Sequence, residues 1–430
     1  MTPAPIKIEV HPHLDEVFND LEQRRAQWSL LRGESLLSSP EDVDVLVAQK
    51  DAGRVVGALE ELGFVHLPAW GRGPHHFFID YDPSSDTFIK IDVVTALCYG
   101  SLHEFRSDLG TQCLERRRRN GNINILHPDD AFWTLLLHCL VDKGYVAPHH
   151  RVRLQELAST VDQSSAACRI VDGLVPPSWT TEGLLESITL GRWELLEALA
   201  PSVTAAWSRK QGAAVLVRRA VNRCLRLLTR ALLVPRRGVS VALLAPDGGG
   251  KSTLTAGLER TFPLPVRTVY MGLARASGAE TPYRTKALGT ARIFRQWRRY
   301  LVGRYHQSRG RLVIFDRYIY DALLPSRRPL STAKKARRWL LGRLCPSPNL
   351  VLLLDAPAEI LHRRSGQHTV AFLEQRRLDY LSLEQRVPNL RVLDASRAPD
   401  DVRRAATQHV WDIFEKRQER SKKGPRKVFG

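Results

Sequence analysis

The sequence predicts an α/β protein with a parallel sheet in its C-terminal part, an α+β domain at its N-terminus and a helical region between them. From residue 238 onward, apolar runs of strand length alternate with helical stretches, which is typical of a parallel sheet covered on both faces. Before residue 105 the apolar runs are shorter and turn-forming clusters separate them, whereas residues 106–237 show mainly helical periodicity.

Residues 1–105 form the first predicted domain. Its strand signals include VDVLV (43–47) and FIKIDVV (88–94), and DAGRVVGALEELG (51–63) has the pattern of an amphipathic helix. Clusters of Gly, Pro, Asp and Ser at 71–74 and 82–86 are typical of turns between strands. This mixture predicts an α+β fold.

Residues 106–237 form the predicted helical middle region. DDAFWTLLLHCLVDKG (129–144) begins with an acidic pair and ends at a glycine, as a helix does. GLLESITLGRWELLEALA (183–200) repeats apolar residues at helical spacing. Pro235 and Gly238 mark the predicted end of the region.

Residues 238–415 form the third predicted domain. Its expected strands are SVALLA, VRTVYMG, RLVIFD, NLVLLLD and LRVLDAS, with a helical stretch between each strand and the next. Residues 416–430 are rich in Lys and Arg, and we expect a disordered basic tail there.

Composition limits the class of protein. The chain has 430 residues, 43% hydrophobic and 25% charged, as in a soluble globular protein. No run approaches the roughly 18 apolar residues that a membrane span needs, the N-terminus lacks a secretory pattern, and the six cysteines are scattered. These features predict a cytoplasmic protein.

The net charge of +19 would attract nucleotides. It leaves nucleic-acid binding open without favouring it, because the basic residues are spread along the chain.

The stretch APDGGGKSTL (245–254) has the spacing of a phosphate-binding loop between a strand and a helix, with Ala245 where the first glycine is expected. Three glycines let backbone amides turn toward phosphate oxygens, and the helix N-terminus favours negative charge. Lys251 can reach the β- and γ-phosphates, and the Ser252 hydroxyl can bind Mg²⁺. We therefore expect ATP and Mg²⁺ as cofactors, with ATP bound by Asp247, Gly248, Gly249, Gly250, Lys251, Ser252 and Thr253.

Further motifs follow in order. They are FDRYIYD (315–321), LLLDAPAEILHRRSGQHT (352–369) and VLDAS (392–396). Together with Asp247 and the phosphate loop, these motifs resemble the thymidylate kinase family of P-loop nucleotide kinases, over residues 238–415.

The resemblance implies phosphoryl transfer from ATP to a nucleoside monophosphate-like acceptor. Asp247, Arg317 and Tyr318 would bind the acceptor, and Asp316 would lie near Mg²⁺ or the attacking oxygen. The remaining implied residues are the catalytic cations Lys251, Arg317, Arg363 and Arg364 and the Mg²⁺ candidates Ser252, Asp316 and Asp355. No clear base-recognition signature follows Tyr270, so another nucleotide, a nucleoside or a small alcohol stays open as acceptor. The resemblance allows a homodimer, and the sequence leaves the oligomeric state open.

Three carboxylates mark a second site in the first domain. Asp42 and Asp44 lie two apart in an expected strand and share a face, and Asp92 lies within a later apolar strand. Three converging acids can bind two Mg²⁺ ions. This pattern resembles the nucleotidyltransferase superfamily, in its aminoglycoside nucleotidyltransferase-like branch, over about residues 14–105; its Gly-Ser pair is here interrupted as Gly33-Glu34-Ser35.

Three functions remain open from the sequence. The first is kinase-like phosphoryl transfer by residues 238–415, which releases ADP. The second is nucleotidyl transfer to a small hydroxyl substrate by the first domain, with the P-loop domain accessory, which releases pyrophosphate. The third is a non-enzymatic, nucleotide-gated binding protein, which would bind ATP without acceptor-dependent turnover.

Overall fold

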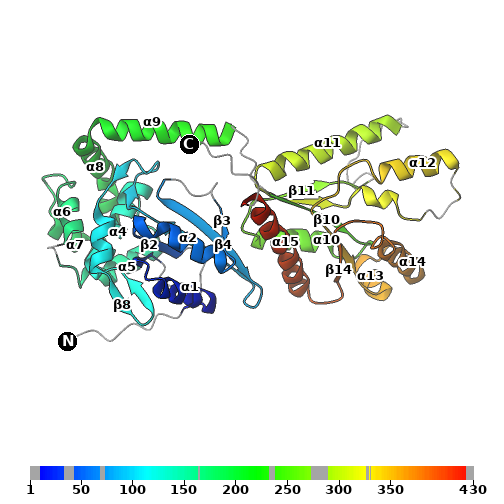
Figure 1. Ribbon diagram of the computed structural model, residues 1–430, viewed down its shortest axis with the longest axis horizontal. Helices are drawn as coiled ribbons and strands as arrows, with labels where there is room; N and C mark the ends of the chain where they lie inside the picture. Colours follow the sequence, from blue (N-terminus) through cyan, green and yellow to red (C-terminus); the bar gives the residue numbers. More distant parts are fainter. Residues whose placement is uncertain are drawn as a thin grey trace. The chain divides into compact units, whose positions relative to one another are not determined.

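The structure is a computed structural model that describes residues 10–32, 43–67, 73–162, 165–231, 238–272, 289–325, 329 and 331–422 (Figure 1). The chain forms two compact units, residues 1–232 and 233–430. Among the described helices, none combines the length and apolar character that crossing a bilayer requires.

The second unit contains the predicted parallel sheet, which is confirmed. Its five strands are ordered β11 (Val266–Tyr270), β12 (Leu312–Asp316), β10 (Val239–Leu244), β13 (Leu350–Asp355) and β14 (Leu390–Asp394). Every neighbouring pair is parallel. Since β10 is central, the loop that follows it lies at the carboxyl edge of the sheet between the ends of β12 and β13, where ligands bind in open α/β sheets.

Helices cover this sheet on both faces (Figure 1). They are α10 (Lys251–Thr261), α11 (Gly289–Ser308), α12 (Thr332–Leu341), α13 (Ala358–Ser365), α14 (Val370–Leu381) and α15 (Pro399–Lys422), with a short 3₁₀ turn at Ile319–Ala322. Helix α15 differs from the prediction because residues 416–422 are helical rather than part of a disordered tail. This segment is rich in Lys, Arg, Gln and Glu, which are strong helix formers, and it continues a helix anchored by buried Trp411 and Phe414.

The first unit is built on a mixed seven-stranded sheet. Its order is β3 (Val65–His66), β4 (His75–Asp82), β5 (Thr87–Val94), β2 (Val43–Val47), β1 (Trp28–Arg32), β9 (Ile123–Ile125) and β8 (Arg118–Asn120). Strand β2 is parallel to β5 and antiparallel to β1. A separate two-stranded sheet pairs β6 (Cys98–Tyr99) with β7 (Phe105–Arg106).

The helices of the first unit begin with α1 (Pro12–Gln23) and α2 (Ala52–Glu61), which follows a 3₁₀ turn at Gln49–Asp51. The remaining helices are α3 (Leu109–Arg116), α4 (Pro128–Leu137) with a π-helical turn at His138–Lys143, α5 (Pro148–Ala158), α6 (Ala166–Asp172), α7 (Thr181–Thr189), α8 (Trp193–Gln211) and α9 (Ala213–Ala231).

The predicted boundary at 105/106 does not separate two compact units. Strands β8 and β9 come from the predicted helical region, yet they extend the N-terminal sheet. Leu46 and Val94 of that sheet also share one core with Trp133 and Leu136 of α4. The helical region therefore completes the first domain instead of standing apart from it.

Candidate functional site

The phosphate loop turns directly from β10 into α10. Gly248 and Gly250 have φ angles of +82° and +85°, which residues with a side chain rarely adopt. A Cβ atom at Gly249 would lie 2.6 Å from the Cβ of buried Ala245. The alanine at the first loop position is thus accommodated because residue 249 has no side chain.

Lys251 points back over this loop. Its Nζ donates to the carbonyl oxygens of Ala245 at 3.0 Å and Pro246 at 3.1 Å. Burial, together with the nearby Arg317 guanidinium, lowers the pKa of Lys251 to about 8. An anionic phosphate in the loop would favour the charged form and offset this burial.

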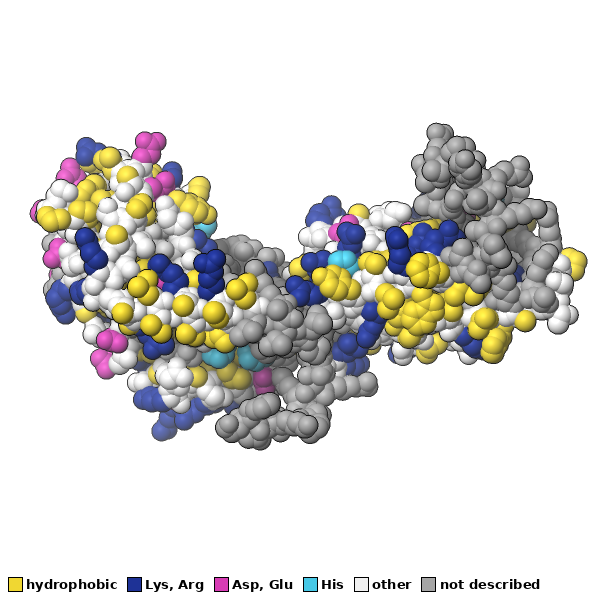
Figure 2. All heavy atoms as spheres, turned by 90° about the horizontal axis from the view of Figure 1, so that it is seen from above, with side chains coloured by type: hydrophobic (Ala, Val, Ile, Leu, Met, Phe, Trp, Pro, Cys, Tyr) yellow, Lys and Arg dark blue, Asp and Glu magenta, His cyan; other side chains and the backbone are white. Residues whose placement is uncertain are grey.

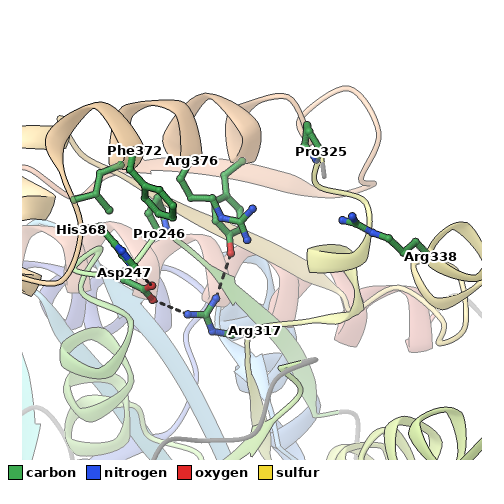
Figure 3. A pocket seen from close by; sticks show the side chains of 10 residues that line it. Pro246, Asp247, Arg317, Pro325, Arg338, His368, Phe372 and Arg376 are labelled. Atoms are coloured by element: carbon green, nitrogen blue, oxygen red, sulfur yellow. Dashed lines mark hydrogen bonds and ion pairs between the residues drawn. The ribbon is translucent and has the colours of Figure 1, made fainter. Parts of the chain in front are cut away.

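Two cavities open from the loop. The larger, about 1240 Å³, is lined by residues 247–254 and by Asp316, Arg317 and Arg364 among others. The smaller, about 370 Å³, is lined by ten residues that include Arg338, His368 and Phe372 (Figure 3). Both cavities share Asp247, Arg317 and Arg376, so these side chains lie between them.

Arg317 is the centre of the network between the cavities (Figure 3). Its Nη2 lies 2.8 Å from Oδ1 of Asp247, and its Nη1 donates to the Tyr380 hydroxyl at 3.3 Å. The backbone of Arg317 is left-handed, with φ +63°, and its amide donates to the Leu243 carbonyl at 3.1 Å. Such a conformation costs of order 1–2 kcal/mol for a residue with a Cβ, and strained residues of this kind concentrate at functional sites.

Asp321 and Tyr380 belong to the same network, although the sequence analysis did not select them. The Tyr380 hydroxyl donates to Oδ1 of Asp321 at 3.1 Å, and Oδ2 of Asp321 lies 3.7 Å from Arg317. Burial raises the pKa of the Asp321 carboxyl despite this neighbouring cation. The sequence could have indicated Asp321 as a site residue, because it lies four positions after Arg317. It could not have indicated Tyr380, which is far away in the sequence.

The structure distinguishes the two arginines of helix α13. Arg364 lines the large cavity, and its Nη1 donates to the Ala395 carbonyl at 2.8 Å. Arg363 is exposed and is not among the residues that line either cavity. The lining also includes Arg376 of α14 and Arg397 of the turn between β14 and α15, which the sequence did not single out because arginines are common surface residues.

Two predicted roles need correction. Tyr318 is fully buried, and its hydroxyl donates to the Pro346 carbonyl at 2.6 Å, so it belongs to the core and not to an acceptor site. Asp355 is held by Arg377 through two bonds, from Nε to Oδ1 at 2.7 Å and from Nη2 to Oδ2 at 2.9 Å. Asp355 thus joins β13 to α14, and it is not among the residues that line either cavity, where Mg²⁺ would accompany the phosphates.

Ser252 and Asp316 remain as Mg²⁺ candidates, and both line the large cavity. The described residues contain no group of three or more His, Cys, Asp or Glu side chains placed to hold a metal ion. At nucleotide sites Mg²⁺ takes only one or two protein oxygens, because phosphates and water supply the rest. The donor set therefore fits a phosphate-bound Mg²⁺.

The first unit brings two of its three predicted carboxylates together. Asp44 and Asp92 are register partners in the parallel β2–β5 pair, whereas Asp42 lies outside the described residues. Asp44 is bonded to Arg32 at 2.6 Å, and Oδ2 of Asp92 lies 2.7 Å from Nδ1 of His75. Oδ1 of buried Asp92 has no hydrogen-bond partner among the described residues.

No protein-family model matches the chain, and no curated protein matches it. Among solved structures, the chain is similar to a thymidylate kinase from Candida albicans, with 19% sequence identity and a TM-score of 0.31. The match covers 42% of this chain and 93% of that one.

Proposed function

We propose that the second unit transfers the γ-phosphoryl group of ATP to a phosphate-bearing acceptor of the nucleoside monophosphate kind. One observation carries this proposal. The phosphate loop and a second, cation-lined cavity share a wall made by Asp247, Arg317 and Arg376. Such an arrangement suits a donor and an acceptor whose reacting phosphates meet at that wall.

The large cavity would hold ATP. The left-handed glycines leave backbone amides free to face phosphate oxygens, and the N-terminus of α10 adds partial positive charge. The Lys251 ammonium would leave the carbonyl oxygens of Ala245 and Pro246 and donate to oxygens of the β- and γ-phosphates. Mg²⁺, bound near Ser252 and Asp316, would neutralise charge on the same phosphates.

The small cavity would hold the acceptor. Its charged lining consists of Arg317, Arg338 and Arg376 against the single carboxylate of Asp247, with the His368 ring beside them. This excess of cations favours an anionic acceptor over a neutral alcohol or sugar. Asp247 would accept a hydrogen bond from an acceptor hydroxyl, and Arg317 would bind the acceptor phosphate.

The reaction balances without an added acid or base. An acceptor phosphate oxygen forms a bond to the γ-phosphorus while the bond from that phosphorus to the β,γ-bridging oxygen breaks, and ADP leaves with the electron pair. The residues named here position the two anions and offset their charge. Arg364, at the edge of the large cavity, would stabilise charge on the transferring group.

The test is ADP release from Mg-ATP by the full chain across a panel of nucleoside monophosphates, nucleosides and sugars. We expect ADP only with a phosphate-bearing acceptor, and loss of turnover in Lys251→Met. Turnover with neutral sugars but not with monophosphates would contradict the acceptor, and full activity in Lys251→Met would contradict the donor site.

Nucleotidyl transfer by the first unit is a second candidate, supported by the pairing of Asp44 with Asp92 and the unpartnered Oδ1 of Asp92. It predicts pyrophosphate release that Asp92→Asn abolishes and Lys251→Met leaves intact. Pyrophosphate formation that survives Asp92→Asn would exclude this site. ATP binding with neither product would favour the nucleotide-gated binding protein.

A further inference from the structure

Helix α11 packs on the sheet through a side that is partly polar. Its buried positions include Gln296 and Gln307, which are 2% and 3% exposed, together with the core residue Tyr300. The two glutamines donate to the carbonyls of Gly272 and Gly238. Gly303 lies on the same side, where a Cβ would come within 2.5 Å of the Phe315 ring. The inward side is therefore less apolar than that of an ordinary surface helix, whose apolar stripe faces the core.

The outward side of α11 is mainly apolar, with the exposed Arg298 among its aromatic and aliphatic residues. Phe294 is 72% exposed, and Leu301 and Tyr305 are each 56% exposed. These residues are four, seven and eleven positions apart and so follow one side of the helix. Trp297 and Val302 extend the same side, with 37% and 40% exposure. Aromatic and aliphatic side chains gathered on one outward face indicate a binding surface.

The arginine side chains of α11 have no acidic counterpart within the helix. Helix α11 contains arginines, among them exposed Arg298 and Arg304, and no acidic residue. Helix α12, on the same side of the second unit (Figure 1), repeats the pattern: Trp339 and Leu340 are 57% and 49% exposed, and the helix carries Lys and Arg but no acid. Figure 2 shows hydrophobic and basic side chains adjoining on this unit.

We propose that the outward faces of α11 and α12 bind an anionic membrane surface, with both helices lying in the plane of the lipid headgroups. Aromatic and leucine side chains on one face, bordered by basic residues, are the features of helices that lie at such an interface. The absence of acids from both helices supplies the charge complementarity, since each cation near an anionic bilayer contributes attraction. Arg338 of α12 lines the small cavity, but Phe294, Leu301 and Trp339 of this surface line neither cavity, so the proposal does not depend on the proposed reaction.

Other occupants fit the same face less well. A second copy would bring Arg298, in the middle of the outward face, against arginines of an identical helix that has no acid to pair with them. A nucleic-acid strand would satisfy the arginines and could stack on Phe294, but it would leave Leu301 and Val302 without an apolar partner. A bilayer interface satisfies both the cations and the aliphatic groups.

The test is co-sedimentation of the full chain with phosphatidylcholine vesicles, with and without phosphatidylserine. We expect binding only to the phosphatidylserine vesicles, weakening as salt is added.

The double variant Phe294→Asp with Leu301→Asp should bind at least tenfold more weakly. A second double variant, Arg298→Gln with Lys335→Gln, removes one exposed cation from each helix. Its affinity for the anionic vesicles should fall roughly thirtyfold, at about 1 kcal/mol for each cation. This variant keeps the apolar face intact, so it still tests the proposal if the first variant fails to fold. Leu195→Asp is the matched control, since Leu195 is 49% exposed on α8 of the first unit; it should bind as the unchanged protein does.

Three results would overturn the proposal. One is equal binding to both vesicle types, or vesicle binding that neither double variant weakens. Another is a dimer by sedimentation analysis that Phe294→Asp with Leu301→Asp converts to a monomer, which would identify a second copy as the occupant. The third is tighter binding to single-stranded DNA than to the anionic vesicles.

Discussion

The guanidinium of Arg317 lies 2.8 Å from the carboxylate of Asp247, and this pair forms the wall between the two cavities. Asp247 comes from the loop after β10, and Arg317 follows the adjacent strand β12. The two groups that we propose for the acceptor are thus held together before the acceptor arrives. The pair is partly exposed, with side chains 24% and 44% accessible, so its own contribution to stability is small.

We predict that Arg317→Ala and Arg317→Gly both raise the acceptor KM strongly, since a charge-assisted bond to the acceptor phosphate is lost. The two variants should differ in stability. At φ +63°, glycine relieves the left-handed strain, so Arg317→Gly should be more stable than Arg317→Ala by roughly 1 kcal/mol. Acceptor kinetics and urea unfolding measure the two effects. An unchanged KM with lower stability in both variants would mean that Arg317 is only structural.

Tyr380 and Asp321 should act as positioning residues for Arg317. Tyr380→Phe removes the hydroxyl that accepts from Arg317 Nη1 at 3.3 Å and donates to Asp321 at 3.1 Å. Because one hydrogen bond contributes about 1 kcal/mol, we expect the acceptor KM to rise roughly fivefold with kcat little changed. Tyr320→Phe is the matched control, as its hydroxyl bonds Ser347 and the residue lines neither cavity. Equal effects of both variants would contradict a specific role.

The features that the sequence predicted correctly are local ones. Strand β10, the glycine loop and the start of α10 follow one another directly, so their geometry could be read from spacing. Tyr318 and Asp355 were misjudged because their partners, the Pro346 carbonyl and the Arg377 guanidinium, reach them only through tertiary packing. Tyr380 was missed for the same reason, since 59 residues separate it from Asp321.

The contact between Ala245 and Gly249 makes the loop sensitive to one methyl group. A Cβ at residue 249 would lie 2.6 Å from the Ala245 methyl, well inside van der Waals contact. We predict that Gly249→Ala abolishes ATP binding, that Ala245→Gly is tolerated, and that the double variant Ala245→Gly with Gly249→Ala regains much of the binding. Isothermal titration with a non-hydrolysable ATP analogue measures all three. No recovery in the double variant would show that another contact of residue 249 limits the loop.

Binding of ATP should weaken as the pH rises through about 8. Burial lowers the pKa of Lys251 to about 8, so the free protein loses the charge that binds phosphate above this value. Below pH 8 the ammonium is present in both free and bound states, and the affinity should be flat there. Above pH 8 the Kd should rise by up to about tenfold per pH unit, because binding must restore the proton. Lys251→Met should bind weakly at every pH, and a steep rise that persists in this variant would assign the titration to another group.

Arg364 and Arg363 provide a matched pair for the catalytic cation. They are exposed neighbours on α13, yet only Arg364 is among the residues that line the large cavity. The bond from Arg364 to the Ala395 carbonyl holds its guanidinium at the cavity edge, where charge on the transferring group would develop.

We predict that Arg364→Ala lowers kcat by about a hundredfold with little change in the ATP Kd. Arg363→Ala should change kcat less than twofold, since Arg363 lines neither cavity and its charge is screened by solvent and salt. Single-turnover rates at saturating ATP and acceptor would separate the two. Similar losses in both variants would indicate a general effect of charge on α13, and a loss confined to Arg363→Ala would require α13 to turn its other side to the transferring phosphate during the reaction.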